Sequence, residues 1–396
     1  MDYQTKIESI KIKNYRVLQD VVLHDLPRMV VVIGTNGTGK STLFDVFSFL
    51  QDALNQDVAT AVARRGGFRE LVSRGCTGPI EFTIKFRESG GRLASYMLQI
   101  AIDDGKIVVN REVLSYRIGQ HGWAWRFVDF KKGVGKAIVN EAEYGKPGMS
   151  EEWEHHELSN PSTLAIKGLG QFRDFPVVSE LRSLIEGWYI SDFHVSNTRT
   201  SIENWHAEHL SPIGDNLAQV AKYLYESYPG RFQQVLDAIC RCVPGVSNVE
   251  AKPTEDGRLI LRFQDGSFQD PFIARHVSDG TLKLFAYLVL LYDPKPHPLL
   301  AVEEPENYLY YKFLHELAEE FRAYAMRGGQ VFISTHSPEF LNGVDLKEVF
   351  ALVKRNGFAE VERPYKSETL RNMFESGDFL LGPLFRQGLL VGAGIQ

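Results

Sequence analysis

Apolar and polar residues follow different spacings in successive parts of the chain. Near the N-terminus, residues 7–13 and 21–26 alternate between apolar and polar, which predicts the two strands of a hairpin. Residues 29–33 are apolar throughout and predict a buried strand. After Ser41, the run TLFDVFSFLQDAL spaces its apolar residues as an amphipathic helix does. A buried strand, a short loop and a helix are therefore expected in succession.

The middle of the chain changes from one spacing to the other. Between residues 79 and 140, the segments IEFTIKF, YMLQIAI, KIVVNREVLSYRI and WAWRFVDF alternate and are separated by glycine-containing turns. This pattern predicts an antiparallel β-subdomain. From about 145 to 245 the spacing is helical and irregular, and the clearest helices are ELRSLIEGWY, NLAQVAKYLYESY and RFQQVLDAICRCV.

The last third of the chain alternates short apolar strands with helices. The predicted strands are 259–263, 299–302, 330–334, 349–354 and 358–362, and the predicted helices are 281–292, 310–326 and 368–374. Strands that are apolar throughout and alternate with helices are typical of a mostly parallel sheet covered on both faces. The sequence therefore predicts the α/β class.

The amino-acid composition restricts the expected cellular compartment more than it restricts the expected fold. Of the residues, 44% are hydrophobic and 24% are charged, as in folded soluble proteins. No apolar stretch approaches the ~18 residues of a membrane span, and the N-terminus has no signal-peptide core. Three cysteines cannot form a disulfide framework, so we expect a cytoplasmic protein. The net charge of −6 argues against general coating of nucleic acid and leaves a local basic groove open.

The loop between the first buried strand and its helix reads GTNGTGKST and fits a P-loop. Glycines let backbone N–H groups point at phosphates, and the helix N-terminus adds its positive dipole end. Lys40 would reach the β- and γ-phosphates, and the Ser41 hydroxyl would bind Mg²⁺. The alternative is a chance match, which the flanking strand and helix make remote. The predicted nucleotide-binding residues are Gly34, Asn36, Gly37, Gly39, Lys40, Ser41 and Thr42.

A pair of carboxylates follows the buried strand at 299–302. We expect Glu303 to hold the magnesium shell and Glu304 to orient and deprotonate the attacking water. Adjacent carboxylates repel each other, so a cation beside them would relieve an electrostatic cost. The alternative is a solvated acidic loop.

Two further motifs could contact phosphate groups. His336 ends the buried strand at 330–334, where it could bind a γ-phosphate or the attacking water; a purely structural histidine is the alternative. Ser278 and Gly280 open the apolar helix of residues 281–292, a helix N-terminus that favours anions. An ordinary helix cap is the alternative there. Because one P-loop already surrounds most of one triphosphate, this second helix end makes most sense if it serves the ATP of another molecule.

Together these motifs resemble those of the ABC-type ATPases of the RecF/SMC/OLD group, in particular their short stand-alone members. The matching stretches span nearly the whole chain: IKIKNYRVL, GTNGTGKST, GGFRELVSRG, LSPIGDNLAQVAKYL, VSDGTLKLFAYLVLL, EEPEN and QVFISTHSPEFLN. The resemblance implies a P-loop ABC-ATPase head with a mixed central sheet, an antiparallel β-subdomain and a helical insertion lobe. It also implies ATP and Mg²⁺ as ligands. Ser278 and Gly280 of one subunit would cap the ATP of the other in a homodimer, and Arg16 would lie near the nucleotide.

We expect three segments: an ATPase lobe at 1–145, a mainly helical insertion at 146–250 and a second ATPase lobe at 251–396. Several features depart from the family pattern. Glu303 stands where Asp is more usual, Tyr310 where many relatives have His, and no Q-loop glutamine can be named. The long coiled coils of the SMC branch are absent, and roughly 60 residues after His336 are too few for a Toprim nuclease domain.

Three functions are compatible with these motifs. The first is an ATP-gated homodimer that recognises DNA in repair or in defence against foreign DNA; a solvated surface is the alternative use of its basic residues. The second is a regulatory ATPase that controls a separately encoded nuclease or toxin, docked by the C-terminal LLGPLFRQGLLVGAGIQ, which could equally pack on its own core. The third, a transporter subunit, is disfavoured by SDGT and EEPE, and we expect no membrane partner. The basic residues are Lys11, Lys13, Arg64, Arg65, Arg69, Arg74, Lys131 and Lys132.

Overall fold

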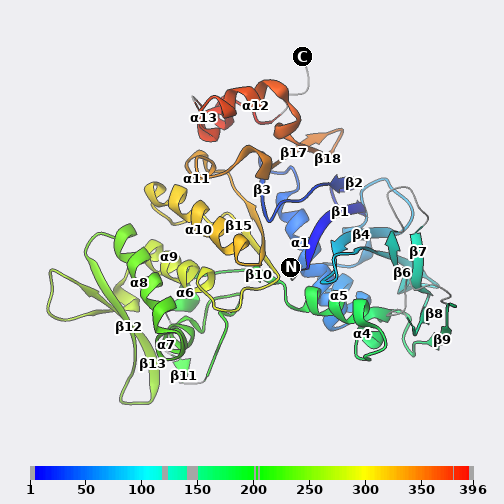
Figure 1. The fold of residues 1–396 in the computed structure, drawn as a ribbon, viewed down its shortest axis with the longest axis horizontal. Coiled ribbons are helices and arrows are strands. Elements are labelled where there is room, and N and C mark those ends of the chain that lie inside the picture. Colours follow the sequence, from blue (N-terminus) through cyan, green and yellow to red (C-terminus); the bar gives the residue numbers. More distant parts are fainter. Residues whose placement is uncertain are drawn as a thin grey trace. The chain divides into compact units, whose positions relative to one another are not determined.

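The chain divides into two compact units that interleave in sequence. The computed structural model describes residues 5–117, 124–140, 150–199, 202–203, 206–377 and 379–391 (Figure 1). Unit 1 comprises residues 1–188, 346–372 and 388–396, and unit 2 comprises residues 189–345 and 373–387. The three-segment division expected from the sequence runs along the chain instead, and it stays a prediction.

In unit 1, a buried strand leads into the glycine loop and a long helix, as predicted. Strand β3 (Met29–Ile33) is buried at all five positions, and helix α1 spans Lys40–Asn55. Strand β17 (Val349–Arg355) lies parallel to β3 although it comes some three hundred residues later in the chain. Strand β18 (Phe358–Glu362) pairs antiparallel with β17. This part of the unit therefore combines parallel and antiparallel neighbours.

The rest of unit 1 is dominated by an antiparallel sheet (Figure 1). Its described strands lie in the order β2 (Leu18–Leu23), β1 (Lys6–Tyr15), β4 (Ile80–Arg87), β5 (Leu93–Asp103), β6 (Lys106–Arg117), β7 (Ala124–Lys131), β8 (Val134–Ile138) and β9 (Trp153–Glu157). Helix α1 packs against this sheet through Phe49, whose ring lies 5.8 Å from that of Tyr15 and 5.4 Å from that of Phe82. Ile118 and Trp123, in the predicted strands, lie outside the described residues.

The stretch predicted to be helical begins with a strand. Strand β9 pairs with β8 and extends the antiparallel sheet, and the expected helices follow it. The helices of unit 1 before residue 189 are α2 (Val58–Ala63), α3 (Phe68–Leu71), α4 (Ala165–Leu169) and α5 (Pro176–Glu186). Polar residues occupy most of β9, so its sequence lacks the apolar alternation by which strands are recognised.

Unit 2 contains a short parallel sheet. Strands β10 (Tyr189–Ser191), β15 (Leu299–Glu303) and β16 (Gln330–Ser334) lie side by side, and Glu303 pairs in register with Ser334. Only the last residue of β15 is exposed. The long helices α9 (Asp279–Leu291) and α10 (Leu314–Met326) belong to the same unit. The carboxyl ends of β15 and β16 therefore meet at one edge.

A second, antiparallel sheet completes unit 2. It contains β11 (Ile202–Glu203), β12 (Val246–Pro253), β13 (Arg258–Asp265) and β14 (Phe272–Ile273), with helices α6 (Val195–Thr198), α7 (Leu217–Ser227) and α8 (Pro229–Cys242). Helices α11 (Pro338–Leu341) and α13 (Leu381–Arg386) also belong here, while α12 (Glu368–Glu375) crosses the boundary at residue 372. Of the C-terminal segment, residues 392–396 lie outside the described residues. No helix in the described part of the chain is long and apolar enough to cross a membrane.

Candidate functional site

The P-loop of unit 1 is shaped by glycines that no other residue could replace without strain. Gly37 and Gly39 have φ angles of 78° and 103°, in the left-handed region. A Cβ atom on Gly39 would lie 2.7 Å from Cγ2 of Val17, and one on Gly34 would lie 2.5 Å from the carbonyl oxygen of Leu352. Both the backbone conformation and the close neighbours therefore require glycine.

Lys40 begins helix α1 and folds back over the loop. Its Nζ donates hydrogen bonds to the carbonyl oxygens of Gly34 (2.8 Å) and Thr35 (3.2 Å), and its side chain is buried. Ser41 is exposed and Thr42 half-buried in the same first turn, and Asn36 is exposed in the loop. Helix α1 has no side-chain cap at its N-terminus. Its backbone N–H groups and one lysine are thus gathered around a glycine loop, a donor set that suits a phosphate chain.

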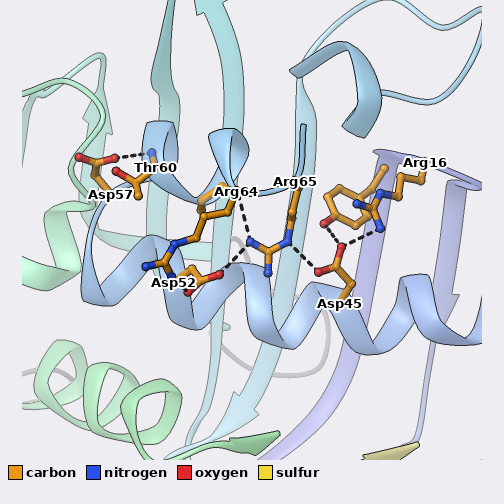
Figure 2. Close-up of polar contacts among 9 residues, drawn as sticks. Arg16, Asp45, Asp52, Asp57, Thr60, Arg64 and Arg65 are labelled. Atoms are coloured by element: carbon orange, nitrogen blue, oxygen red, sulfur yellow. Dashed lines mark hydrogen bonds and ion pairs between the residues drawn. The ribbon is translucent and has the colours of Figure 1, made fainter. Parts of the chain in front are cut away.

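Arg16 is held beside helix α1 by an acidic residue of that helix (Figure 2). Its NH1 lies 3.0 Å from Oδ2 of Asp45. Asp45 also accepts hydrogen bonds from the Tyr15 hydroxyl (2.7 Å) and from Nε of Arg65 (2.7 Å). Burial, with the nearby Asp45 carboxylate, raises the pKa of Tyr15 far above its ordinary value, so this residue stays a hydrogen-bond donor. The network places Arg16 beside the P-loop helix, and the family resemblance implies that this residue lies near the nucleotide.

In unit 2, Glu304 follows strand β15 and lies close to the side chains of Asn307 and His336. Its backbone is left-handed (φ 44°), and its N–H donates to the carbonyl oxygen of Ser334 at 2.9 Å. The Asn307 amide donates to Oε2 of Glu304 at 2.9 Å, and Nε2 of His336 lies 3.3 Å from Oε1. Glu303, the preceding residue, is exposed. The structure thus brings together Glu304 and His336, which the sequence proposes as catalytic residues.

Three residues of this cluster escaped the sequence analysis: Glu306, Asn307 and Lys283. Oε1 of Glu306 accepts hydrogen bonds from the Thr335 hydroxyl (2.8 Å) and from the backbone N–H of His336 (2.7 Å). Glu306 therefore links, by hydrogen bonds, the turn after β16 that carries His336 to the turn after β15 that carries the carboxylates. The repeated carboxylate and amide in EEPEN could have pointed to these contacts.

Lys283 reaches the same cluster from helix α9. Its Nζ donates to the carbonyl oxygen of Asn307 at 2.8 Å, and only 5% of the residue is exposed. Burial lowers the pKa of Lys283 to about 8, although the carboxylates of Glu306 and Glu304 act in the opposite direction. The sequence offered one sign of this residue's role, because Lys283 is a lysine within the otherwise apolar run of helix α9. Lys283 therefore connects helix α9 to the carboxylate turn, residues 303–307.

The motif SDGT, residues 278–281, opens helix α9 in close contact with the loop that follows Glu306. The Ser278 hydroxyl accepts a hydrogen bond from the N–H of Thr281 at 3.2 Å, so within this chain it caps its own helix. A Cβ on Gly280 would lie 2.6 Å from the carbonyl oxygen of Tyr308. Arg199 donates to the carbonyl oxygens of Arg275 (2.7 Å) and Val277 (2.8 Å) and pairs with Asp279. These contacts hold Ser278 and Asp279 exposed at the surface.

The predicted site residues fall into two groups, one in each unit. The P-loop residues and Arg16 belong to unit 1, whereas Ser278, Gly280, Glu303, Glu304 and His336 belong to unit 2. The first group offers N–H donors and cations suited to phosphate. The second offers carboxylates suited to a magnesium shell and to water activation.

Several of the basic residues considered for DNA binding have acidic partners inside unit 1. Arg65 pairs with Asp45 and Asp52 and its side chain is only 9% exposed (Figure 2). Arg64 also pairs with Asp52. Arg74 pairs with Glu70, and Lys132 pairs with Asp103. The charge of these four residues is therefore partly neutralised by neighbouring carboxylates.

The chain resembles known proteins both in sequence and in fold. Residues 29–342 match the family model AAA_21, described as "AAA domain, putative AbiEii toxin, Type IV TA system". Among solved structures, the SmcHead bound to the C-winged helix domain of ScpA is similar, with a TM-score of 0.55 and 14% identity over 90% of this chain and 96% of that chain. A search of curated proteins found no match.

A second similar structure is the Smc head domain with an extended coiled coil from Pyrococcus furiosus, bound to the C-terminal domain of ScpA. Its TM-score is 0.50 at 14% identity, and the alignment covers 94% of this chain and all of that chain. At this identity the likeness establishes the fold. The chain has the mixed α/β fold of an SMC-type ABC-ATPase head, with a mixed sheet and an antiparallel β-subdomain, as the sequence predicts.

Proposed function

The chain belongs to the AAA_21 family of P-loop ATPase domains, and on this premise we propose that it hydrolyses ATP with Mg²⁺ and that ATP joins two copies into a dimer. The observation that carries the proposal is the glycine cradle of the P-loop. Neighbouring atoms leave no room for a Cβ at Gly34 and Gly39, Gly37 has a left-handed backbone, and Lys40 folds over the loop. A phosphate chain is the ligand class that such a cradle suits.

Within this proposal, the residues of unit 1 bind the nucleotide. Lys40 exchanges its bonds to the loop carbonyls for bonds to phosphate oxygens, and the N–H groups at the start of α1 contribute their dipole end. Arg16, kept on α1 by Asp45, adds a second cation. Ser41 offers a hydroxyl oxygen of the kind that Mg²⁺ takes, and Glu303 of unit 2 offers a carboxylate oxygen of the same kind. Bound Mg²⁺ would neutralise charge on the phosphates.

The residues of unit 2 serve the hydrolytic step. Glu304 acts as the base that takes a proton from the attacking water, with its carboxylate fixed by Asn307. His336, 3.3 Å from Glu304, orients the same water or a phosphate oxygen. Ser278 and Gly280 cap the nucleotide of the other subunit, since they open a helix whose N-terminal end is exposed at the surface.

A second question is what the dimer acts upon, and we favour a separately encoded effector over DNA. Of the eight basic residues on which direct DNA binding would rest, four have acidic partners: Arg64, Arg65, Arg74 and Lys132. The family description names a putative AbiEii toxin of a type IV toxin–antitoxin system, which supports a role beside a separately encoded protein of such a system. DNA recognition in repair or in defence against foreign DNA is the competing role.

The test measures two properties of the Glu304→Gln protein in the presence of Mg²⁺. The first is its rate of ATP hydrolysis, and the second is its molecular mass with ATP, with and without duplex DNA. We expect turnover to fall by about 100-fold or more and an ATP-bound dimer to accumulate. Glu319→Gln, an exposed carboxylate of the same unit, is the matched control and should keep normal turnover. Unchanged hydrolysis in Glu304→Gln would remove Glu304 as the base.

A second variant tests the dimer itself. Ser278→Arg, combined with Glu304→Gln, should bind ATP and remain monomeric because the arginine fills the space needed by the other subunit's nucleotide. A normal ATP-dependent dimer would contradict the capping role of Ser278. Salt-sensitive retention of duplex DNA by the Glu304→Gln dimer would favour a DNA client, and indifference to DNA would favour a protein partner.

A further inference from the structure

Two histidines and a buried aspartate gather in unit 2, apart from the residues proposed to hydrolyse ATP. His209, Asp293 and His297 offer ligand atoms that all lie within 4.8 Å of one another. Nδ1 of His209 lies 2.6 Å from Oδ2 of Asp293, and the rings of His209 and His297 are 5.3 Å apart. The Asp293 side chain is 4% exposed and that of His209 is 40% exposed. One side of the cluster is thus buried while His209 borders the solvent.

The surrounding structure fixes the positions of two of these residues. The other carboxylate oxygen of Asp293 accepts a hydrogen bond from the backbone N–H of Lys295 at 2.8 Å. The backbone N–H of His297 donates to the Tyr324 hydroxyl at 2.7 Å, and the His297 ring lies 4.9 Å from the ring of Tyr189. Residues 293–298 read DPKPHP, and three prolines in six residues restrict the backbone on both sides of His297. The ligand atoms are therefore presented by a stiff segment.

Two imidazole nitrogens and one carboxylate oxygen form a donor set that suits Zn²⁺. Zinc binds histidine nitrogen and aspartate oxygen at about 2.0–2.2 Å, so the ligand atoms of a tetrahedral site lie roughly 3.3 Å apart. The ligand atoms of His209 and Asp293 are 2.6 Å apart and no pair is more than 4.8 Å apart, a range that includes this value. Rotation of the half-buried His209 side chain would adjust the distances that it makes. A hydrogen-bonded His–Asp pair that binds no metal is the alternative use of the same residues.

We propose that His209, Asp293 and His297 bind one Zn²⁺ ion, leaving the fourth position to a water molecule. The ion would tie the segment before helix α7 to the connection between α9 and β15. His297 lies two residues before β15 begins, and β15 ends in Glu303. The site therefore stabilises the start of the strand that carries the proposed magnesium ligand. It is independent of ATP, and its presence can be measured without any assay of hydrolysis.

The experiment is a titration of the full-length chain, stripped of metal, with Co²⁺ and then Zn²⁺. Co²⁺ in a tetrahedral nitrogen and oxygen site gives visible absorption bands, and Zn²⁺ should abolish them at one equivalent. Asp293→Asn and His209→Ala should each weaken binding by more than about 100-fold, beyond the loss typical of residues that only support a ligand. His206→Ala is the matched control, because His206 is an exposed histidine three residues from His209.

Each outcome decides the proposal. Stoichiometric binding that both ligand variants lose and the control keeps would support it. Wild-type protein that shows no tetrahedral Co²⁺ spectrum would overturn it, without reliance on any variant. A thiolate charge-transfer band would place the metal on cysteine instead. Equal binding in wild type and Asp293→Asn would likewise exclude this cluster, provided that both proteins show the same circular dichroism.

Discussion

The P-loop of unit 1 and the carboxylate turn of unit 2 are built by different means. The P-loop depends on backbone conformation, because Gly37 and Gly39 are left-handed and a Cβ on Gly39 has no room. The carboxylate turn depends on side chains, because Asn307 donates a hydrogen bond to Glu304 and His336 lies 3.3 Å from it. Lys283 donates to the carbonyl oxygen of Asn307. A backbone-built site requires specific residues in sequence order, whereas a side-chain cluster collects partners from distant elements.

The largest effect on ATP binding is expected at the backbone-built site. Lys40→Ala should reduce ATP affinity by about 100-fold or more, since a charged hydrogen-bond donor to phosphate is lost. Nucleotide affinity can be measured by calorimetry. Lys167→Ala is the matched control, because Lys167 donates to Asn55 and Gln56 at the other end of helix α1. Equal losses in the two variants would indicate damage to the helix and not to the P-loop.

A smaller effect is expected where Glu304 is positioned by a neighbour. Asn307→Ala should lower kcat by roughly 10-fold, because one hydrogen bond that fixes the carboxylate is lost and the carboxylate itself remains. ATP affinity should be nearly unchanged. Steady-state kinetics separate the two quantities. A rise in KM with an unchanged kcat would mean that Asn307 supports nucleotide binding and not the proposed base.

Replacing Lys283 should change the pH dependence of stability more than it changes the rate of ATP hydrolysis. Its pKa of about 8 lies below the ordinary value of a free lysine, so between pH 8 and pH 10.5 the unfolded chain holds the proton more tightly. The stability of wild type relative to Lys283→Met should therefore rise with pH across this window. Denaturant unfolding at several pH values measures the difference. Lys312→Met, an exposed lysine of the same unit, should show no such trend.

Lys283→Met should change the rate of ATP hydrolysis by only a few-fold at pH 7. Loss of the positive charge near Glu304 and Glu306 alters the electric field at the carboxylate turn but leaves Asn307 and His336 in place. Wild-type turnover should change as the pH rises through about 8, and the Lys283→Met profile should lack that step. An identical step in both proteins would assign it to another group.

Almost no effect on turnover is expected from Glu112→Gln in the antiparallel sheet of unit 1. Buried Glu112 accepts hydrogen bonds from the N–H groups of Ala165 (2.5 Å) and Ile166 (3.1 Å), at the start of helix α4. Burial raises the pKa of Glu112 to about 7, so the folded chain holds the proton more tightly than the unfolded chain between pH 4.5 and pH 7. Wild-type stability relative to Glu112→Gln should fall across that range, by about 1.4 kcal/mol for each unit of the shift. A flat difference in unfolding free energy would contradict the raised pKa.

Prediction from the sequence succeeded where the pattern is local. The expected strand at 29–33 is β3, and the expected strands at 330–334 and 358–362 are β16 and β18. Strand β9 was missed because its residues are mostly polar, and its place is set by pairing with β8. Strand β12 was missed as well, since few of its residues are buried. A strand that depends on its neighbours leaves a weak apolar pattern.

The sequence by itself determined the strand–loop–helix of the P-loop, the carboxylate pair, the histidine after β16 and the family resemblance. These features follow from residues that are close in the chain, where apolar spacing and glycine requirements act directly. Only the tertiary structure showed that Asp45 pairs with Arg16, that Lys283 lies near Glu304 and Glu306, and that His209 contacts Asp293. Those partners are separated by tens of residues, and only folding brings their charges within a few ångströms.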